Sequence, residues 1–428
     1  MKKYLILVVI FITMLGNNFK VYGKEENKEV RAVWLTTVYN IDWPASKDYN
    51  NIEEQKSSLS QNMQFVKEQN LNTVFFQVRG MGDALFPSSY APWSRYLTGV
   101  FGKNPGYDPL KLALYQAHRR GLEFHAWFNP FRIDANDKTF NKEAYISSLP
   151  TGSPLKNNPN WIVKYGQYHW LDIGIPEVRD YVMNIILEVV KNYDVDGVHI
   201  DDYFYPYPIK GIEFPDNNTY AKYGKGYSNI GDFRRDNVNK FIKELNNKIK
   251  SIKPGVKFGV SPFGVWRNGT ALGGTPTNSL SSYDSLYADS KKWVEEEWID
   301  YIVPQIYWEF ENKTSPYGIL VDWWSRIVQG KSVKLYIGHA AYKVGESATY
   351  GAAWGKGSEM ENQIKYARDK KNVNGSSFFS LRDLKNNKLG MTTTLKNIYS
   401  SPLNINKNSW VIENTKVKLY FKKINWGF

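Results

Sequence analysis

Eight short β-rich segments alternate with helix-like segments along most of this chain, and that alternation constrains the fold more than any other feature. Apolar residues between them recur with helical period, most clearly over residues 176–193. Strands alternating with helices form a parallel sheet, and eight strands close it into a barrel. We predict an α/β fold, a (β/α)8 TIM barrel; a doubly wound open sheet is the alternative. The β-rich segments are residues 31–38, 73–79, 122–128, 197–201, 256–261, 299–307, 334–338 and 376–381.

Four connections that follow predicted strands are long. Loops at the carboxyl ends of barrel strands build the active sites of such enzymes. We predict that the barrel with its long loops spans residues 24–400, and that the β-leaning residues 401–428 form a short C-terminal extension of open role. The long connections are residues 80–107, 129–175, 203–231 and 266–283.

The amino terminus has the pattern of a secretory signal peptide. Lys2 and Lys3 precede an apolar run over residues 4–15, which is short for a membrane span, and residues 21–23 offer a cleavage site. We predict that residues 1–23 are a signal peptide, with an uncleaved N-terminal anchor as the alternative. The mature protein is then expected to be a secreted or cell-wall-associated monomer with no integral membrane segment.

Composition and missing motifs exclude several classes of chemistry. The chain has no Cys, which excludes thiol catalysis and Cys-based zinc sites. No P-loop, H-E-x-x-H, Rossmann fingerprint or G-x-S-x-G elbow is present, and we expect no cofactor and no metal. The net charge of +13 suits a polyanionic wall surface. We expect no nucleic-acid partner, because the Lys residues are scattered.

The strongest local signal for chemistry lies in residues 196–204, Asp-Gly-Val-His-Ile-Asp-Asp-Tyr-Phe. Alternation places His199 and Asp201 on the face of the predicted strand that points into a barrel. Burying a carboxylate is energetically costly, so one at the carboxyl end of a strand is expected either to take part in catalysis or to pair with an Arg. We predict that Asp201 or Asp202 is a general acid. Adjacent strand residues point opposite ways, so we do not expect these two to form the working pair.

Glycoside hydrolysis generally uses a second carboxyl group several ångströms from the first. Asp83, in a glycine-flanked loop after the second predicted strand, is the first candidate. Glu309, after the sixth, is the second candidate. Each also fits the role of an ordinary loop carboxylate.

Polar and aromatic side chains lie at or near several other predicted strand ends, where we expect them to bind sugar hydroxyl groups and ring faces. Arg79 or Arg132 would meet an acidic substituent. Each His alone also fits a structural role, and a metal site from His125, His199 and Asp201 is an alternative. The predicted substrate-binding residues are Gln77, Arg79, Trp93, His125, Asn129, Arg132, His199, Tyr203, Ser261, Gln305, Tyr307, Trp308 and His339.

Seven ordered motifs resemble those of the glycosyl-hydrolase-like ten family, and the resemblance spans residues 29–398. It implies a TIM barrel, an exported or envelope location, and cleavage of peptidoglycan glycan strands, preferentially strands stripped of stem peptides. It carries over no settled catalytic pair. The motifs are residues 31–36 (RAVWLT), 77–84 (QVRGMGDA), 92–99 (PWSRYLTG), 125–130 (HAWFNP), 196–203 (DGVHIDDY), 261–267 (SPFGVWR) and 301–308 (YIVPQIYW).

The motifs depart from two better-known hydrolase patterns. Retaining barrel hydrolases place a Glu after strand four and another on strand seven, where this chain has Tyr203 and the acid-free residues 336–339. Strand four is also similar to the D-G-x-D-x-D-x-E pattern of chitinase-like enzymes, again with Tyr203 in place of the acid. We predict a secreted glycoside hydrolase of denuded peptidoglycan that uses carboxylate acid/base chemistry. A non-catalytic wall-glycan-binding barrel and a hydrolase of a biofilm polysaccharide are the alternatives.

Overall fold

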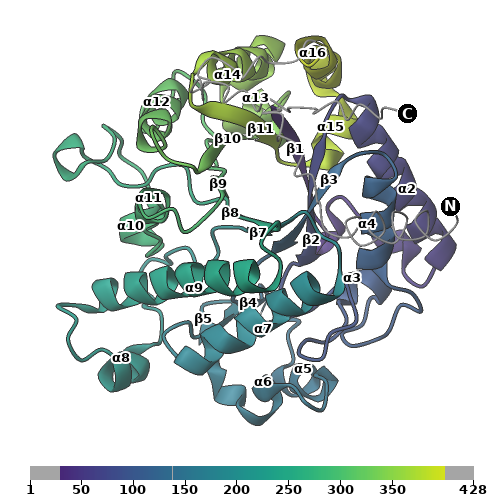
Figure 1. The fold of residues 1–428 in the computed structure, drawn as a ribbon, viewed down its shortest axis with the longest axis vertical. Helices are drawn as coiled ribbons and strands as arrows, with labels where there is room; N and C mark the ends of the chain where they lie inside the picture. Colours follow the sequence, from purple (N-terminus) through teal and green to yellow (C-terminus); the bar gives the residue numbers. More distant parts are fainter. Residues whose placement is uncertain (1–28, 137, 401–428) are drawn as a thin grey trace, which may run out of the picture. The chain divides into compact units, whose positions relative to one another are not determined.

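Eight parallel strands close into a barrel, as the alternation predicts (Figure 1). The computed structural model describes residues 29–136 and 138–400. The predicted signal peptide and the predicted C-terminal extension therefore lie outside the described residues. Around the barrel the strands follow the order β1, β11, β10, β9, β8, β7, β3, β2. They are β1 (Val30–Leu35), β2 (Thr73–Arg79), β3 (Glu123–Phe128), β7 (Gly197–Ile200), β8 (Lys257–Val260), β9 (Tyr301–Ile302), β10 (Lys334–His339) and β11 (Val373–Phe378).

Most strands differ from their predicted bounds by a few residues, and two of the differences are informative. The segment 299–307 contributes only the two paired residues of β9 to the sheet, and Pro304 follows them without the N–H that a ladder needs. The last strand begins at Val373 rather than at residue 376, because Gly375 lies against the backbone of Val30, where a Cβ would be 2.1 Å from the carbonyl oxygen.

Helices surround the barrel (Figure 1), and the main outer helices each bury apolar residues. In α7, Val178, Val182 and Ile186 are fully buried, and Pro176 opens the helix at its first turn. None of the helices in the described part of the chain combines the length and the apolar character needed to cross a membrane. The main outer helices are α2 (Ile52–Glu68), α4 (Pro109–His118), α7 (Pro176–Asn192), α9 (Ile230–Ile252), α11 (Ser290–Glu295), α12 (Tyr317–Ile327), α14 (Gly357–Asp369) and α16 (Met391–Ile398).

The long connections carry structure of their own. The connection after β3 contains a three-stranded antiparallel sheet in the order β4, β6, β5, and the connection after β7 contains α8 (Asn217–Tyr223). The extra strands are β4 (Arg132–Asp134), β5 (Ile162–Tyr165) and β6 (Tyr168–Leu171). The remaining short helices are α3 (Arg95–Thr98), α5 (Lys142–Ser148), α6 (Pro154–Asn157), α10 (Ser282–Ser285), α13 (Ser347–Tyr350) and α15 (Leu381–Asn386).

A chain of hydrogen bonds crosses the interior of the barrel and holds two His residues that we expected to bind substrate. The indole N–H of Trp34 lies 3.1 Å from His199 Nε2, and His199 Nδ1 lies 3.1 Å from the Tyr301 hydroxyl. That hydroxyl lies 2.7 Å from His125 Nδ1, and His125 Nε2 lies 2.8 Å from Glu123. An indole only donates, so His199 accepts at Nε2 and is protonated at Nδ1. Both rings therefore brace the core.

Gly259 leaves room for the Tyr301 ring, and replacing it is expected to destabilise the barrel. A Cβ at Gly259 would lie 2.3 Å from that ring. Forcing a methyl group into a packed core costs about 1–3 kcal/mol. We expect Gly259→Ala to lower the free energy of unfolding in urea by that amount. Gly255→Ala is the control, because a Cβ there has nothing within 4 Å. Equal stability of the two variants would show that the ring is not held in place.

Candidate active site

A pocket of about 260 Å³ opens at the carboxyl ends of the barrel strands, and we call it the mouth pocket. Its walls come from the segments that follow β1, β7, β8 and β9, together with the ends of β2 and β3 and the sheet inserted after β3. This is the end of a TIM barrel where catalytic groups gather. The predicted site residues that line it are Gln77, Arg132, Asp201, Asp202, Tyr203, Ser261, Gln305 and Tyr307.

Asp201 and Asp202 both line the mouth pocket, although adjacent residues within a strand would point opposite ways. Strand β7 ends at Ile200, so strand alternation no longer governs the two residues that follow it. Asp201 accepts hydrogen bonds from the Trp127 indole at 3.0 Å and from the Tyr203 backbone N–H at 3.3 Å. Asp202 accepts one from the Tyr207 hydroxyl.

Burial and mutual repulsion keep one proton on this carboxylate pair. Burial raises the pKa of Asp201 to about 7, and the negative charge of Asp202 adds to that rise. Burial also raises the pKa of Asp202, but hydrogen bonds from Tyr207 and Gln305 and the charge of Arg132 oppose it. Asp202 has two side-chain donors and Asp201 has one, so Asp202 is the group that ionises first. Burial therefore favours the protonated form of Asp201 up to a pH of about 7, while the hydrogen bonds to Asp202 favour its charged form.

Arg132 brings a positive charge to the same pocket. Its guanidinium lies 4.5 Å from the centre of the Tyr203 ring, and Nη2 donates to the Gly80 carbonyl at 3.0 Å. Its Nε is buried and has no hydrogen-bond partner among the described residues. The planar group is therefore held in place, with its positive charge at the lining of the pocket.

Gln77 and Gln305 serve as braces as well as lining residues. The Gln77 side-chain oxygen accepts from the backbone N–H groups of Thr37 at 3.0 Å and Val38 at 2.9 Å, which holds the segment after β1 beside the pocket. The Gln305 amide donates to the Ser261 carbonyl at 2.9 Å. These bonds fix the backbone that carries the pocket walls.

The structure does not place Asp83 where a second catalytic carboxylate is needed. Asp83 is fully buried outside the lining of the mouth pocket, and Met81 N–H lies 3.4 Å from its Oδ1. The Ser94 hydroxyl and the charges of Arg79 and Arg95 also act on its carboxyl group. The glycines that we expected to bring this loop to a ligand instead bring it into a buried ionic cluster. The geometry therefore favours Asp202 as the partner of Asp201.

Glu309, the other candidate, also lies outside the pocket lining. Its carboxylate accepts from the Trp354 indole at 3.2 Å and from the Asn312 amide at 3.0 Å. Glu309 therefore links the connection after β9 to the connection after β10.

Several predicted substrate-binding residues lie outside the mouth pocket. His339 is fully buried, with Nε2 3.0 Å from the Ser376 hydroxyl, and burial lowers its pKa to about 4. Asn129 is fully buried and accepts from the Arg132 backbone N–H at 3.3 Å, so it positions Arg132. The members outside the pocket are Arg79, Trp93, His125, Asn129, His199, Trp308 and His339.

The pocket also contains residues that we did not predict. Tyr207, in the Tyr-rich stretch just after the strand-four motif, is the most informative, because its hydroxyl holds Asp202. Its place in an aromatic loop directly behind two carboxylates was the signal that could have found it. Trp34 and Trp127 line the cavity although both are buried. The unpredicted lining residues are Trp34, Thr36, Val38, Tyr39, Ile41, Trp127, Tyr207, Tyr342 and Phe379.

Asp42 links the segment that follows β1 to the segment that follows β11. It accepts from the Thr36 backbone N–H at 2.7 Å and from the Ser380 hydroxyl at 2.8 Å, and those residues follow β1 and β11. Burial raises its pKa to about 6. The sequence offered no sign of this contact, since Asp42 and Ser380 are far apart in the chain.

A model of the glycosyl hydrolase-like 10 family matches residues 29–356. The chain belongs to this family. Glycosyl hydrolase YngK of Bacillus subtilis (strain 168) is 44% identical over 420 residues, which cover 97% of this chain and 80% of that relative. Glycosyl hydrolase DigH of Escherichia coli (strain K12) is 41% identical over 353 residues, 80% of each chain.

Solved structures of glycoside hydrolases share the fold of this family member. The glycoside hydrolase domain of PgaB (BpsB) from Bordetella bronchiseptica aligns with a TM-score of 0.57 at 13% identity, over 87% of this chain and 98% of that one. The endo-1,4-beta-mannanase from Rhizomucor miehei aligns with a TM-score of 0.52 at 12% identity, over 87% and 95%. At such identities the likeness shows the fold alone. Family and fold together confirm the prediction of a glycoside hydrolase on a TIM barrel.

Proposed function

We propose that this chain is a secreted or cell-wall-associated enzyme that hydrolyses peptidoglycan glycan strands stripped of their stem peptides. The observation that carries the proposal is the Asp201–Asp202 pair, one acid and one carboxylate, in the mouth pocket. Hydrolysis of a glycosidic bond uses such a pair. The basic charge of the chain suits an anionic wall.

Asp201 is the general acid in this mechanism. It gives its proton to the glycosidic oxygen as the bond to the anomeric carbon breaks. The Trp127 indole donates a hydrogen bond that stabilises the carboxylate left on Asp201. Asp202 is the base: it accepts a proton from the attacking nucleophile, whether that is water or the acetamido group of the substrate. Tyr207 and Gln305 orient Asp202 for this step.

Arg132 gives a chemical reason for a preference for stripped strands. Removing a stem peptide from the glycan exposes a carboxylate on the sugar that bore it. The positive charge of a guanidinium that lines the pocket attracts that carboxylate but gains little from the amide that replaces it in an intact strand.

The direct test uses the mature protein and purified glycan strands, with and without stem peptides, and identifies the products by mass spectrometry. Short fragments from the stripped strands alone are expected, and the reducing-end sugar names the bond that is cut. Strands that bind but stay intact would overturn the proposal and favour the wall-glycan-binding alternative. Cleavage of another polysaccharide alone would move the substrate to that polymer.

The pH profile is expected to show an alkaline limb near neutrality. Asp201 must be protonated to act as the acid, and its pKa is raised to about 7. The protonated fraction therefore falls as pH rises through that value, and kcat/KM falls with it. We expect Tyr207→Phe to move the acidic limb to higher pH, because Asp202 loses a hydrogen bond to its charged form. A rate that stays constant well above pH 7 would contradict the role of Asp201.

A further inference from the structure

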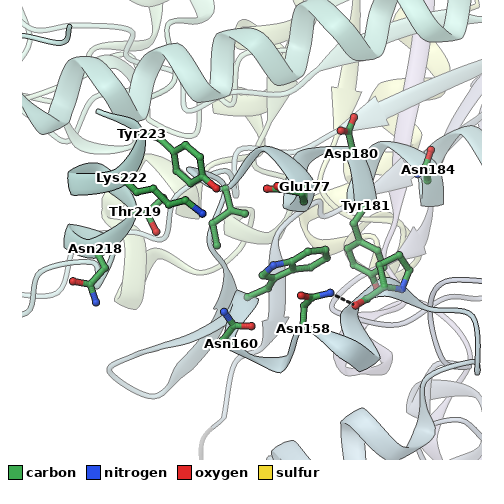
Figure 2. Close-up of a pocket in the computed structure, with 13 residues that line it drawn as sticks. Asn158, Asn160, Glu177, Asp180, Tyr181, Asn184, Asn218, Thr219, Lys222 and Tyr223 are labelled. Atoms are coloured by element: carbon green, nitrogen blue, oxygen red, sulfur yellow. Dashed lines mark hydrogen bonds between the residues drawn. The ribbon is translucent and has the colours of Figure 1, made fainter. Parts of the chain in front are cut away.

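A second cavity of about 690 Å³ lies on the outer side of the barrel, and we call it the flank groove. It lies between α7, α8 and the segment from α6 to Trp161 (Figure 2). No described residue that lines it also lines the mouth pocket. Its volume is typical of a ligand site.

The flank groove has an aromatic floor and a rim of amides. Trp161 and Tyr181 are buried, with ring centres 6.1 Å apart, while Asn160, Asn184 and Asn218 are exposed on the rim. Within the described residues these three amides have no hydrogen-bond partner in the protein. A free amide both donates and accepts, as a sugar hydroxyl or acetamido group requires, and aromatic carbon suits the apolar face of a sugar ring.

The walls of the groove are held in place before any ligand binds. The Thr219 hydroxyl donates to Asp172 at 2.5 Å, which ties α8 to the segment before α7. The Asp216 carboxylate, at the start of α8, pairs with Arg234 of α9 at 2.6 Å. The Asn158 amide donates to the Pro154 carbonyl at 2.8 Å (Figure 2). A preformed site loses less entropy on binding than a mobile one.

The groove carries few charges, and acidic groups outnumber basic ones among its described lining residues. The charged residues among the described lining are Glu177 and Asp180, which are acidic, and Lys222, which is basic. Figure 2 shows the Lys222 and Tyr223 side chains of α8 on the side of the groove that faces Glu177. A net negative lining disfavours nucleic acid, so the groups of a ligand that suit the groove are uncharged hydroxyl and acetamido groups.

We propose that the flank groove is a second glycan-binding site, which holds a saccharide chain away from the bond that is cleaved. The inference takes its ligand class from the proposed function. The connection that carries Tyr203 and Tyr207 also carries α8, so one segment lines both sites. A polymer that occupies the groove and the mouth pocket together is held more tightly than either contact alone allows.

The test compares two triple variants in an Asp201→Asn background, so that the polymer stays intact. Asn160→Ala, Asn184→Ala and Asn218→Ala remove the rim amides. Gln61→Ala, Asn247→Ala and Asn397→Ala remove exposed amides from α2, α9 and α16 as a matched control. We expect the rim variant to bind insoluble stripped glycan strands at least tenfold more weakly than the control, since each lost hydrogen bond changes affinity roughly two- to tenfold.

A second readout separates the groove from the mouth pocket. With Asp201 restored, we expect the rim variant to hydrolyse a short soluble N-acetylglucosamine oligomer or stripped-strand fragment at the control rate. Unchanged polymer binding, or an equal loss on the short substrate, would overturn the proposal. If neither the rim variant nor the control variant cleaves any fragment, the proposed function is wrong. If loss of the rim amides still weakens polymer binding in that case, the proposal of a second glycan-binding site is supported independently.

Discussion

Replacing Asp201 with Asn is expected to lower kcat/KM for glycan cleavage about 10²- to 10⁴-fold, the usual contribution of a general acid. The amide keeps the shape of the carboxyl group but has no proton to give to the leaving oxygen. The variant should remain folded. Because the pKa of Asp201 is raised to about 7 in the folded protein, the native chain holds this proton more tightly than the unfolded chain, so ionisation of Asp201 opposes folding.

The coupling between ionisation of Asp201 and folding predicts a second measurable effect, on the pH dependence of stability. Between the ordinary pKa of Asp and the raised value of about 7, wild-type stability declines as pH rises, and the Asp201→Asn variant lacks this contribution. We therefore expect its Tm near neutral pH to equal or exceed that of the wild type. Kinetics and thermal melts at the same pH measure both effects.

Asp202→Asn and Asp83→Asn are the informative comparisons. Asp202→Asn should also reduce cleavage strongly, and its removal of a negative charge should lower the pKa of Asp201. Asp83→Asn should leave kcat/KM within a few-fold of wild type, because Asp83 lies outside the mouth pocket. Full activity in both strand-four variants, or selective loss in Asp83→Asn, would make the site assignment wrong.

Removing the carboxylate of Asp216 is expected to destabilise the protein by about 3–5 kcal/mol, the usual cost of leaving a buried charge unpaired. The Arg234 guanidinium contacts Asp216 through two hydrogen bonds, Nη2 to Oδ1 at 2.6 Å and Nε to Oδ2 at 2.9 Å. The Asp216 side chain is 0% exposed and the Arg234 side chain is 3% exposed, so water can replace little of the lost interaction. Urea denaturation of Asp216→Ala measures the effect.

Two further variants make this prediction discriminating. Asp216→Leu combined with Arg234→Met removes both charges, and most of the lost stability should return. Glu53→Ala breaks an exposed pair with Lys56, whose side chain is 39% exposed against 85% for Glu53, and should cost less than about 1 kcal/mol. A loss in Asp216→Ala no larger than that of Glu53→Ala would show that the buried pair is not needed. Because Asp216 anchors α8, binding at the flank groove should weaken as well.

The barrel could be predicted from the sequence because buried faces of strands and helices require apolar residues at regular spacings. A strand inside a barrel is apolar over a short run, and a covering helix is apolar every third or fourth residue, so segments such as 197–201 and 176–193 show their environment locally. The strand-four carboxylates could be predicted for the same reason, because charge at the end of an apolar strand is costly. The three-stranded sheet within residues 129–175 was not predicted.

The sequence by itself determined the eightfold βα order, the family, and the place of Asp201 and Asp202 at a strand end. Only the tertiary structure decided which polar side chains share one pocket. His199 and Asp201 are two residues apart, yet one hydrogen-bonds Tyr301 in the barrel core and the other lines the mouth pocket. Asp83 turns into a buried cluster, while Tyr207 reaches Asp202. The physical reason is that each orientation depends on partners from other strands and inserted loops, which no local pattern encodes.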